Sequence, residues 1–305
     1  MIMPNFLIIG AMKAGTTSMY QYLKQHPQIY MSPIKEPQFF PFEGRTLNFR
    51  GPGNQGAPLN SIAVTEIEAY RALFDQVSNQ RAIGEASVIY LYMLNAAERI
   101  KYHIPDVRLI VILRNPADRA YSHFLSRVGW REPITNFAQV LREEKMRIAN
   151  NWGPGWHYAS MGFYYAQLRR YYDNFCSNQI KVYLYEDYMN SPISVLQETF
   201  QFLDVDDKFI PDLSKKHNVS TGVPRNKLLH RLLTKSHPVK SILKPLLSTG
   251  IRANLVNKIV KGVRSHNLGK YEFSLELRKQ LSQLYREDIL KLQDLIQKDL
   301  SKWLD

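Results

Sequence analysis

The first residues with clear chemical potential are Lys13-Ala14-Gly15-Thr16-Thr17-Ser18. Lysine supplies a mobile cation, and the three hydroxyls supply hydrogen-bond donors. Residues 6–9 before them are apolar and predict a short buried strand, and residues 18–25 after them predict a helix that stops at His26-Pro27. A glycine turn between strand and helix brings free backbone N–H groups and the positive end of the helix dipole to one point. We therefore expect this loop to bind a phosphate-like dianion.

A second candidate anion site begins at Arg114, directly after the apolar run 107–113. That run is typical of a central parallel strand, and Asn115-Pro116 ends it. A helix is predicted from residue 117 through 124, which allows Arg114 and Ser122 to face the same point at the carboxyl end of the strand. The guanidinium offers a planar fork for phosphate and the serine adds a donor. Arg119 is expected to serve helix packing or a salt bridge.

The two motifs together indicate the kind of anion. The common nucleotide loop ends in Gly-Lys-Ser/Thr, whereas here the lysine precedes the glycine. Lys-x-Gly-Thr-Thr after an apolar strand resembles the 5′-phosphosulfate loop of sulfotransferases that use 3′-phosphoadenosine 5′-phosphosulfate (PAPS). Arg114 and Ser122 match the 3′-phosphate motif of the same family. Two phosphate sites about one sheet-width apart favour PAPS over ATP, which carries its phosphates in one chain.

Glu36 is the candidate general base. It lies in a segment with prolines at positions 27, 33 and 37, which predict an extended loop, and Phe39-Phe40 follow it. A carboxylate beside aromatic rings is partly desolvated, which suits it to take a proton. From the residues alone, a surface glutamate is the alternative. Glu-x-x-Phe-Phe resembles the segment with the catalytic glutamate in heparan-type sulfotransferases, and that resemblance implies the role of base for Glu36. His157 is a rival base.

Further matches are weaker. Glu85-Ala86-Ser87 resembles a family segment that usually has lysine at the second position in glycosaminoglycan-type enzymes, so Ala86 argues against a heparan-like acceptor. Tyr185-Glu-Asp resembles the family's Tyr-Glu-Asp and implies that Tyr185 contacts the adenine, with packing as the alternative. The late segment 217–226 resembles the loop that closes over the 3′-phosphate, which implies roles for Gly222 and Arg225.

Two irregular segments are candidate parts of an acceptor pocket. Residues 43–60 are rich in glycine and proline and predict either an acceptor-facing flap or a surface loop. Residues 152–165 are crowded with aromatic side chains and predict either a packed loop or a pocket wall.

Helix signals elsewhere are structural. Residues 65–68 have a capping-box pattern that predicts a helix continuing to 77. A long amphipathic helix is predicted from Ser274 to the chain end, and its expected apolar stripe is Leu281, Leu284, Leu292, Leu295, Ile296 and Trp303.

Composition limits the protein class. The 305 residues carry a net charge of +13 and a single cysteine, so no internal disulfide forms and a reducing compartment is expected. No signal peptide or membrane span is evident, which predicts a cytoplasmic protein. Residues 214–270 contain 13 Lys/Arg and no Asp/Glu. This basic, mainly helical stretch is expected to form a lid; it suits a solvated face, an anionic ligand or peripheral membrane contact. No nucleic-acid motif accompanies it.

These observations predict one α/β domain over residues 1–305, with a central parallel sheet flanked by helices. The resemblance implies a PAPS-dependent sulfotransferase that needs no metal and releases 3′-phosphoadenosine 5′-phosphate (PAP). Lys13 and Glu36 would be catalytic, and the acceptor would be an intracellular small molecule, natural product, carbohydrate or glycolipid with a hydroxyl or amine. The alternatives are a nucleotide-dependent kinase and a non-catalytic anion- or membrane-binding protein. The sequence specifies no oligomeric state.

Overall fold

Five parallel strands form the centre of the computed structural model, which describes residues 2–52, 57–128, 131–214, 223–224, 268–269 and 273–305. The strands are β1 (Phe6–Gly10), β2 (Ile29–Met31), β3 (Ala82–Ala86), β4 (Arg108–Leu113) and β5 (Ile180–Leu184). They lie in the order β2-β3-β1-β4-β5. All of β1 and all but the first residue of β4 are buried, as expected for central strands covered on both faces. The predicted α/β fold with a parallel sheet is confirmed.

Helices fill the connections between the strands. The α-helices are α1 (Thr16–Leu23), α2 (Leu59–Ile62), α3 (Ile67–Ala72), α4 (Ala96–His103), α5 (Pro116–Arg127), α6 (Phe137–Ala149), α7 (Tyr164–Asn174), α8 (Tyr185–Asn190), α9 (Pro192–Phe202) and α13 (Leu275–Ile296). The short 3-10 helices are η1 (Phe40–Phe42), η2 (Pro154–Trp156), η3 (Ser160–Gly162), η4 (Ser177–Gln179) and η6 (Ser301–Trp303). A separate antiparallel pair joins β6 (Val223–Pro224) to β7 (Leu268–Gly269).

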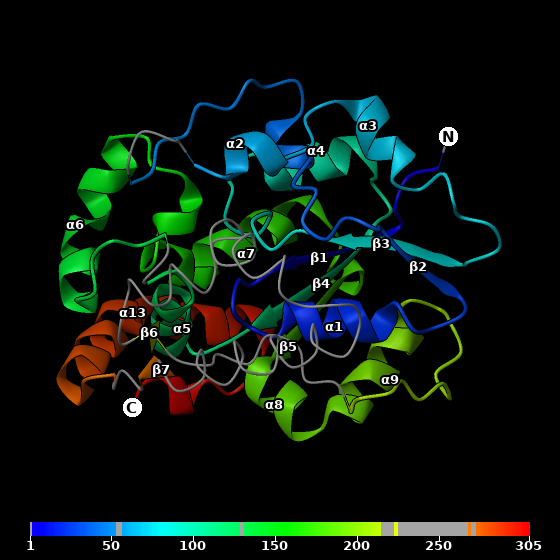
Figure 1. The fold of residues 1–305 in the computed structure, drawn as a ribbon. Helices are drawn as coiled ribbons and strands as arrows, with labels where there is room; N and C mark the ends of the chain where they lie inside the picture. The colour runs from blue at the N-terminus through cyan, green and yellow to red at the C-terminus, as the bar shows by residue number, and fades with distance from the viewer. Residues whose placement is uncertain (1, 53–56, 129–130, 215–222, 225–267, 270–272) are drawn as a thin grey trace, which may run out of the picture.

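The helices form layers around the sheet. In Figure 1, α1, α8 and α9 gather below the sheet, while α2, α3 and α4 lie above it. The long α13 packs against both α5 and α7, so the end of the chain supports the helix that follows β4. Because β1 and β4 pair in parallel, their carboxyl ends lie next to each other, where α1 and α5 begin. Ligands bind at such a position in open α/β sheets.

Local signals at the chain end are partly confirmed. The helix α13 begins directly after Ser274, in agreement with the predicted start, and the Ser274 side chain caps it by accepting a hydrogen bond from the Leu277 N–H. Leu281 and Leu292 are buried, but Leu284 is 52% exposed and faces outward. Trp303 is buried from η6 rather than from the helix, which ends at Ile296.

The predicted capping box at residues 65–68 is wrong. Glu66 is the N-cap residue of α3 and has an extended backbone, and no side chain caps the helix. The helix ends at Ala72 instead of continuing to 77. The Thr65 hydroxyl donates to the Glu66 carboxylate at 3.4 Å instead of accepting a backbone N–H, so the reciprocal pair does not form.

The basic stretch 214–270 falls almost entirely outside the described residues, and so do Gly222 and Arg225. The lid prediction and the roles of these two residues stay predictions. Within the described part of the chain, no helix has the length and apolar character that crossing a bilayer requires.

Candidate active site

The loop between β1 and α1 has the backbone geometry of an anion site. Gly15 adopts a left-handed φ of 88° immediately before α1, and a Cβ there would lie 3.2 Å from the Tyr188 ring. Both the conformation and the space therefore favour glycine. The first backward hydrogen bond of the helix runs from the Met19 N–H to the Gly15 carbonyl at 3.1 Å. The N–H groups of Thr16, Thr17 and Ser18 precede it and form the helix N-terminus, the end that attracts anions.

Arg114 connects this loop to the second predicted anion site. Its Nη1 donates to the Lys13 carbonyl at 3.2 Å, and its guanidinium lies 4.7 Å from the centre of the Tyr185 ring. Ser122 is buried on the following helix α5. Because β1 and β4 are neighbouring strands, the two predicted sites lie at adjacent positions on the same edge of the sheet. Lys13, Arg114 and Tyr185 are thus brought together.

Positive charge is concentrated at this point. Burial lowers the pKa of Lys13, and the nearby guanidinium groups of Arg114 and Arg127 lower it further. Three cations held close together in a partly dehydrated site repel one another. A bound dianion would relieve that repulsion, so the charge distribution suits an anionic ligand.

Glu36 lies on the loop between β2 and η1. Its carboxylate forms an ion pair with Lys35 at 2.7 Å, and its side chain is 26% exposed. The rings that we expected to desolvate it are turned into the core instead, where Phe39 stacks on Tyr70 with ring centres 4.3 Å apart and Phe40 packs on Tyr70 edge-on. Phe39 and Phe40 thus anchor the loop in the core, whereas Glu36 lines a pocket.

Residues after β3 hold the Glu36 loop in an unfavourable backbone conformation. Glu36 and Gln38 have left-handed φ values of 67° and 59°, which cost about 1–2 kcal/mol for each non-glycine residue. The Glu36 N–H donates to the Ala86 carbonyl at 2.9 Å, and the Gln38 N–H donates to Ser87 Oγ at 3.0 Å. The Phe39 N–H, which comes next, donates to the Tyr90 hydroxyl at 3.0 Å. These bonds offset the strain.

Glu85 lies beneath this arrangement, fully buried. Its Oε1 accepts a hydrogen bond from the Tyr70 hydroxyl at 3.3 Å. Burial raises the pKa of Glu85 to about 7, although the hydroxyls of Tyr90, Ser87 and Tyr70 favour its charged form. Glu85 therefore lies buried next to the hydroxyls of Ser87 and Tyr90, which accept the loop N–H groups.

His157 does not offer a free ring nitrogen. Its Nδ1 lies 2.9 Å from the Tyr92 hydroxyl and its Nε2 lies 3.0 Å from the Trp152 carbonyl. Burial also lowers the pKa of this histidine. With both nitrogens engaged, the geometry favours Glu36 over His157 as the base.

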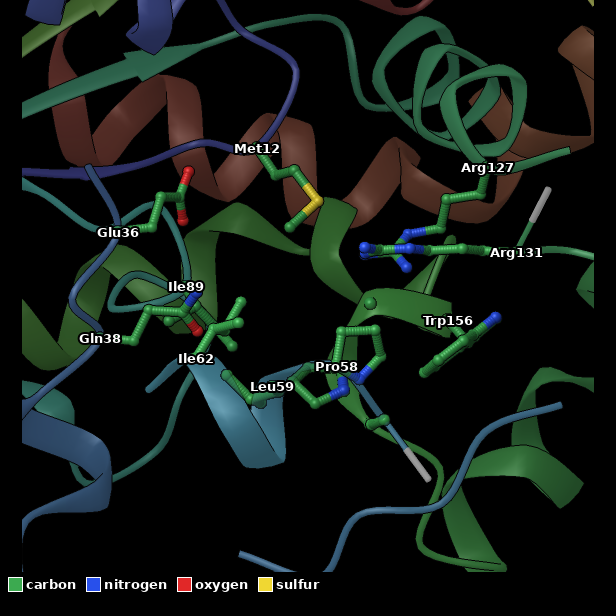
Figure 2. Close-up of a pocket in the computed structure, with 14 residues that line it drawn as sticks. Met12, Glu36, Gln38, Pro58, Leu59, Ile62, Ile89, Arg127, Arg131 and Trp156 are labelled. Atoms are coloured by element: carbon green, nitrogen blue, oxygen red, sulfur yellow. The ribbon is translucent and has the colours of Figure 1, made fainter. Parts of the chain in front are cut away.

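A pocket opens beside the loop that contains Lys13, and Met12 of that loop lines it. Figure 2 shows Glu36 at one end, Arg127 and Arg131 at the other, and Met12 between them. The remaining lining is largely apolar, and most of it comes from the two irregular segments singled out in the sequence: Ala57, Pro58, Leu59, Gly153, Pro154, Gly155 and Trp156. Each segment therefore contributes to a pocket wall.

The sequence predictions missed three features of this site: Glu85 and its hydroxyl partners, Arg127, and Arg131. Arg127 ends the helix α5 that also contains Ser122, so its position on that helix was the available signal. For Glu85, the segment was noted but its burial was not foreseen, because the burial depends on Tyr70 packing from a distant part of the chain. Among the described residues, no three His, Cys, Asp or Glu side chains group as metal ligands do.

Comparison with known proteins identifies what this chain is similar to. The sulfotransferase family model matches residues 4–209. The crystal structure of a sulfotransferase from Alicyclobacillus acidocaldarius is 32% identical, with 100% of both chains covered and a TM-score of 0.76. The likeness thus extends over the whole chain in both sequence and fold.

Curated relatives match over shorter stretches. The membrane-associated sulfotransferase kil1 of Dictyostelium discoideum is 34% identical over 42% of this chain and 24% of its own length. The bifunctional heparan sulfate N-deacetylase/N-sulfotransferase 4 of Mus musculus is 27% identical over 67% of this chain and 22% of its own length. The chain therefore spans about a quarter of the length of these two proteins.

Proposed function

This chain belongs to the sulfotransferase family and is a transferase, and from that premise we propose that it transfers a sulfuryl group from PAPS to a hydroxyl or amine. The observation that supports this donor most directly is the contact between the two anion sites. Arg114 donates to the Lys13 carbonyl at 3.2 Å, so one ligand can reach both sites at once. PAPS has a 3′-phosphate and a 5′-phosphosulfate on opposite sides of its ribose and suits such a pair.

The residues present fit this donor. The turn at Gly15 and the N-terminus of α1, from Thr16 to Ser18, would hold the 5′-phosphosulfate. Arg114 and Ser122 would hold the 3′-phosphate, and Tyr185 lies against Arg114 where an adenine could stack. Burial, and then the neighbouring guanidinium groups of Arg114 and Arg127, lower the pKa of Lys13, and the negative charge of the donor would favour its charged form.

The transfer is an in-line displacement at sulfur. The acceptor oxygen or nitrogen forms a bond to sulfur as the bond from sulfur to the 5′-phosphate oxygen breaks, and PAP leaves. Glu36 takes the acceptor's proton as the new bond forms. Lys13, with the hydroxyls and N–H groups of the loop, stabilises the charge that develops on the leaving oxygen. Glu36 lines the pocket beside this loop, as a base of this kind must.

The acceptor belongs in the pocket between Glu36 and Arg127. Its largely apolar lining with a few charged groups is typical of a small-molecule site. The single cysteine agrees with a cytoplasmic setting. We therefore favour an intracellular metabolite, natural product, carbohydrate or glycolipid as acceptor.

Calorimetric titration with PAP and with ATP tests the donor assignment. We expect the wild type to bind PAP tightly and ATP weakly. Loss of the Arg114 guanidinium should weaken PAP binding by about 10- to 100-fold, because a hydrogen bond to a charged group is worth about 1.5–3 kcal/mol. Arg169→Ala, an exposed arginine on α7, is the matched control. Preference for ATP, or indifference to Arg114→Ala, would restore the kinase or the anion-binding protein as the better explanation.

A further inference from the structure

Arginine side chains give the wall of the pocket opposite Glu36 its positive charge. Arg127 comes from the last turn of α5, and within the described residues no carboxylate forms an ion pair with it. Arg131 lines the same end of the pocket (Figure 2). A partly buried guanidinium loses hydration, and a counter-ion normally restores that loss. Glu132 stabilises the charged form of Arg127 without a direct ion pair, and an anionic ligand in the pocket would supply a direct counter-ion.

Neighbouring groups fix the direction of the Arg127 side chain. Its Nε donates to His123 Nε2 at 3.2 Å, and its guanidinium lies 5.2 Å from the centre of the Trp156 ring. A Cβ on Gly155 would come within 2.3 Å of Arg127 Nη2, so this glycine makes room for the guanidinium. Burial lowers the pKa of His123 well below its usual range, and the neutral ring can accept the bond. Arg127 is therefore held in place before any ligand arrives.

The two ends of the pocket differ in charge and would orient a ligand. Glu36 lies at one end, and the two arginines lie at the other across a largely apolar lining. A ligand with an oxyanion at one end and a nucleophile at the other would fit one way only. The reversed orientation would bring its anion to Glu36, where like charges repel.

We infer that the acceptor has an oxyanion of its own, a carboxylate, sulfate or phosphate, which Arg127 and Arg131 bind while its hydroxyl or amine faces Glu36. This inference rests on the proposed function and adds a substrate class to it. Arginine suits this role, because its planar fork pairs with two oxygens at once. Arg127 becomes the specificity-determining residue for the acceptor.

A second oxyanion competes for the Arg127 guanidinium: the sulfuryl group of the donor. Arg127 is near enough to Lys13 to lower the pKa of its ammonium group, although less than burial and Arg114 do. The acceptor is favoured because Arg127 and Arg131 both line the pocket that Glu36 lines, whereas Lys13 does not. The two sources make opposite predictions about donor affinity.

The first arm of the test uses PAP-saturated protein titrated with naphthalene-2-sulfonate and with its neutral sulfonamide. We expect the wild type to bind the sulfonate at least about tenfold more tightly, as charge-assisted hydrogen bonds allow. Arg127→Gln should reduce this preference to about threefold or less and leave sulfonamide binding intact. Arg131→Gln should reduce it by a smaller factor and serves if Arg127→Gln fails to fold. Arg142→Gln, an exposed residue of α6, is the control.

The second arm compares PAPS with PAP. If the acceptor supplies the oxyanion, Arg127→Gln leaves the ratio of the two affinities unchanged. A selective loss of PAPS affinity would assign Arg127 to the donor and overturn the inference. Three results of the first arm would also overturn it: equal binding of the two naphthalene probes, binding of neither probe, or a preference for the sulfonate that survives both substitutions. Failure of the protein to bind PAP would instead reject the proposed function, so the two failures are distinguishable.

Discussion

The proposed donor side and the proposed acceptor side of this site are built in different ways. The donor side uses the ends of regular elements: β1 and β4 stop side by side, and α1, α5 and α8 begin there. The acceptor side uses irregular segments around residues 36, 57 and 154, which side chains hold in place. Backbone geometry therefore defines the anion site, while side-chain contacts define the pocket. Loops on a rigid scaffold are the usual means by which one fold changes its substrates.

The two sides also differ in charge. The donor side collects Lys13, Arg114 and a helix N-terminus, which all favour the same ligand charge. The pocket separates its charges, with Glu36 at one end and arginines at the other. The first arrangement binds an anion strongly, and the second sets the direction of a ligand. Substitutions on the two sides should therefore change different measurements.

Loss of the base should have the largest effect and should leave the donor side untouched. Glu36→Gln is expected to slow sulfuryl transfer by about 1,000-fold, within the range for removal of a general base. PAP affinity should stay within about twofold of the wild type. Labelled-donor transfer to a metabolite extract and PAP calorimetry measure the two sides separately. Glu66→Gln, an exposed carboxylate at the start of α3, is the control; a parallel loss of PAP binding would contradict the separation.

Loss of the lysine should come next. Lys13→Met is expected to slow transfer by about 100-fold, because it removes the cation nearest the leaving oxygen. PAP should still bind, since the loop N–H groups and Arg114 remain, so the substitution acts on the rate more than on binding. Single-turnover transfer and calorimetry measure the two effects. Lys24→Met, an exposed residue after α1, should match the wild type, and equal losses in rate and binding would show that Lys13 only binds.

Two substitutions should each remove one hydrogen bond that holds the Glu36 loop. Ser87→Ala removes the acceptor of the Gln38 N–H, and Tyr90→Phe removes that of the Phe39 N–H. Each should lower the free energy of unfolding by about 1–3 kcal/mol, the cost of an unpaired buried donor. Amide exchange should quicken at Gln38 in the first variant and at Phe39 in the second. Equal exchange at both sites in both variants would show that the loop is held by packing instead.

The last predicted effect is a change in the pH dependence of stability, without a direct effect on the transfer reaction. The pKa of Glu85 is raised to about 7, so the folded protein keeps a proton that the unfolded chain releases near pH 4.5. The free energy of unfolding should therefore fall by about 3 kcal/mol as pH rises from 4.5 to 7. Glu85→Gln should abolish this component. Urea unfolding across that range measures it.

The comparison with Glu85→Gln also controls for other buried carboxyl groups. Burial also raises the pKa of Asp288, to about 6, which lowers stability with rising pH in the same direction. Because Asp288 is present in both proteins, the difference between the wild-type and Glu85→Gln curves isolates Glu85. A flat difference curve would mean that Glu85 titrates like an exposed carboxyl.

Residues that are close in sequence were the most predictable. The strand, glycine turn and helix around Lys13 lie within 20 residues, and the pair Arg114 and Ser122 lies within one strand-to-helix connection. The start of α13 at Ser274 is similarly local and was predicted. The capping box at residues 65–68 failed although it is local, because Glu66 took the extended N-cap conformation. A local signal holds only where packing agrees with it.

The sequence by itself determined the parallel α/β fold, the family and the position of the anion loop, since strand hydrophobicity, glycine and helix start signals act over a few residues. Only the tertiary structure decided how the Glu36 loop is held, because its partners Ser87 and Tyr90 lie about fifty residues away. It also decided that Arg127 faces a pocket opposite Glu36. Contacts across such separations depend on how β3, α5 and the loops pack together, and no short pattern of residues encodes that packing.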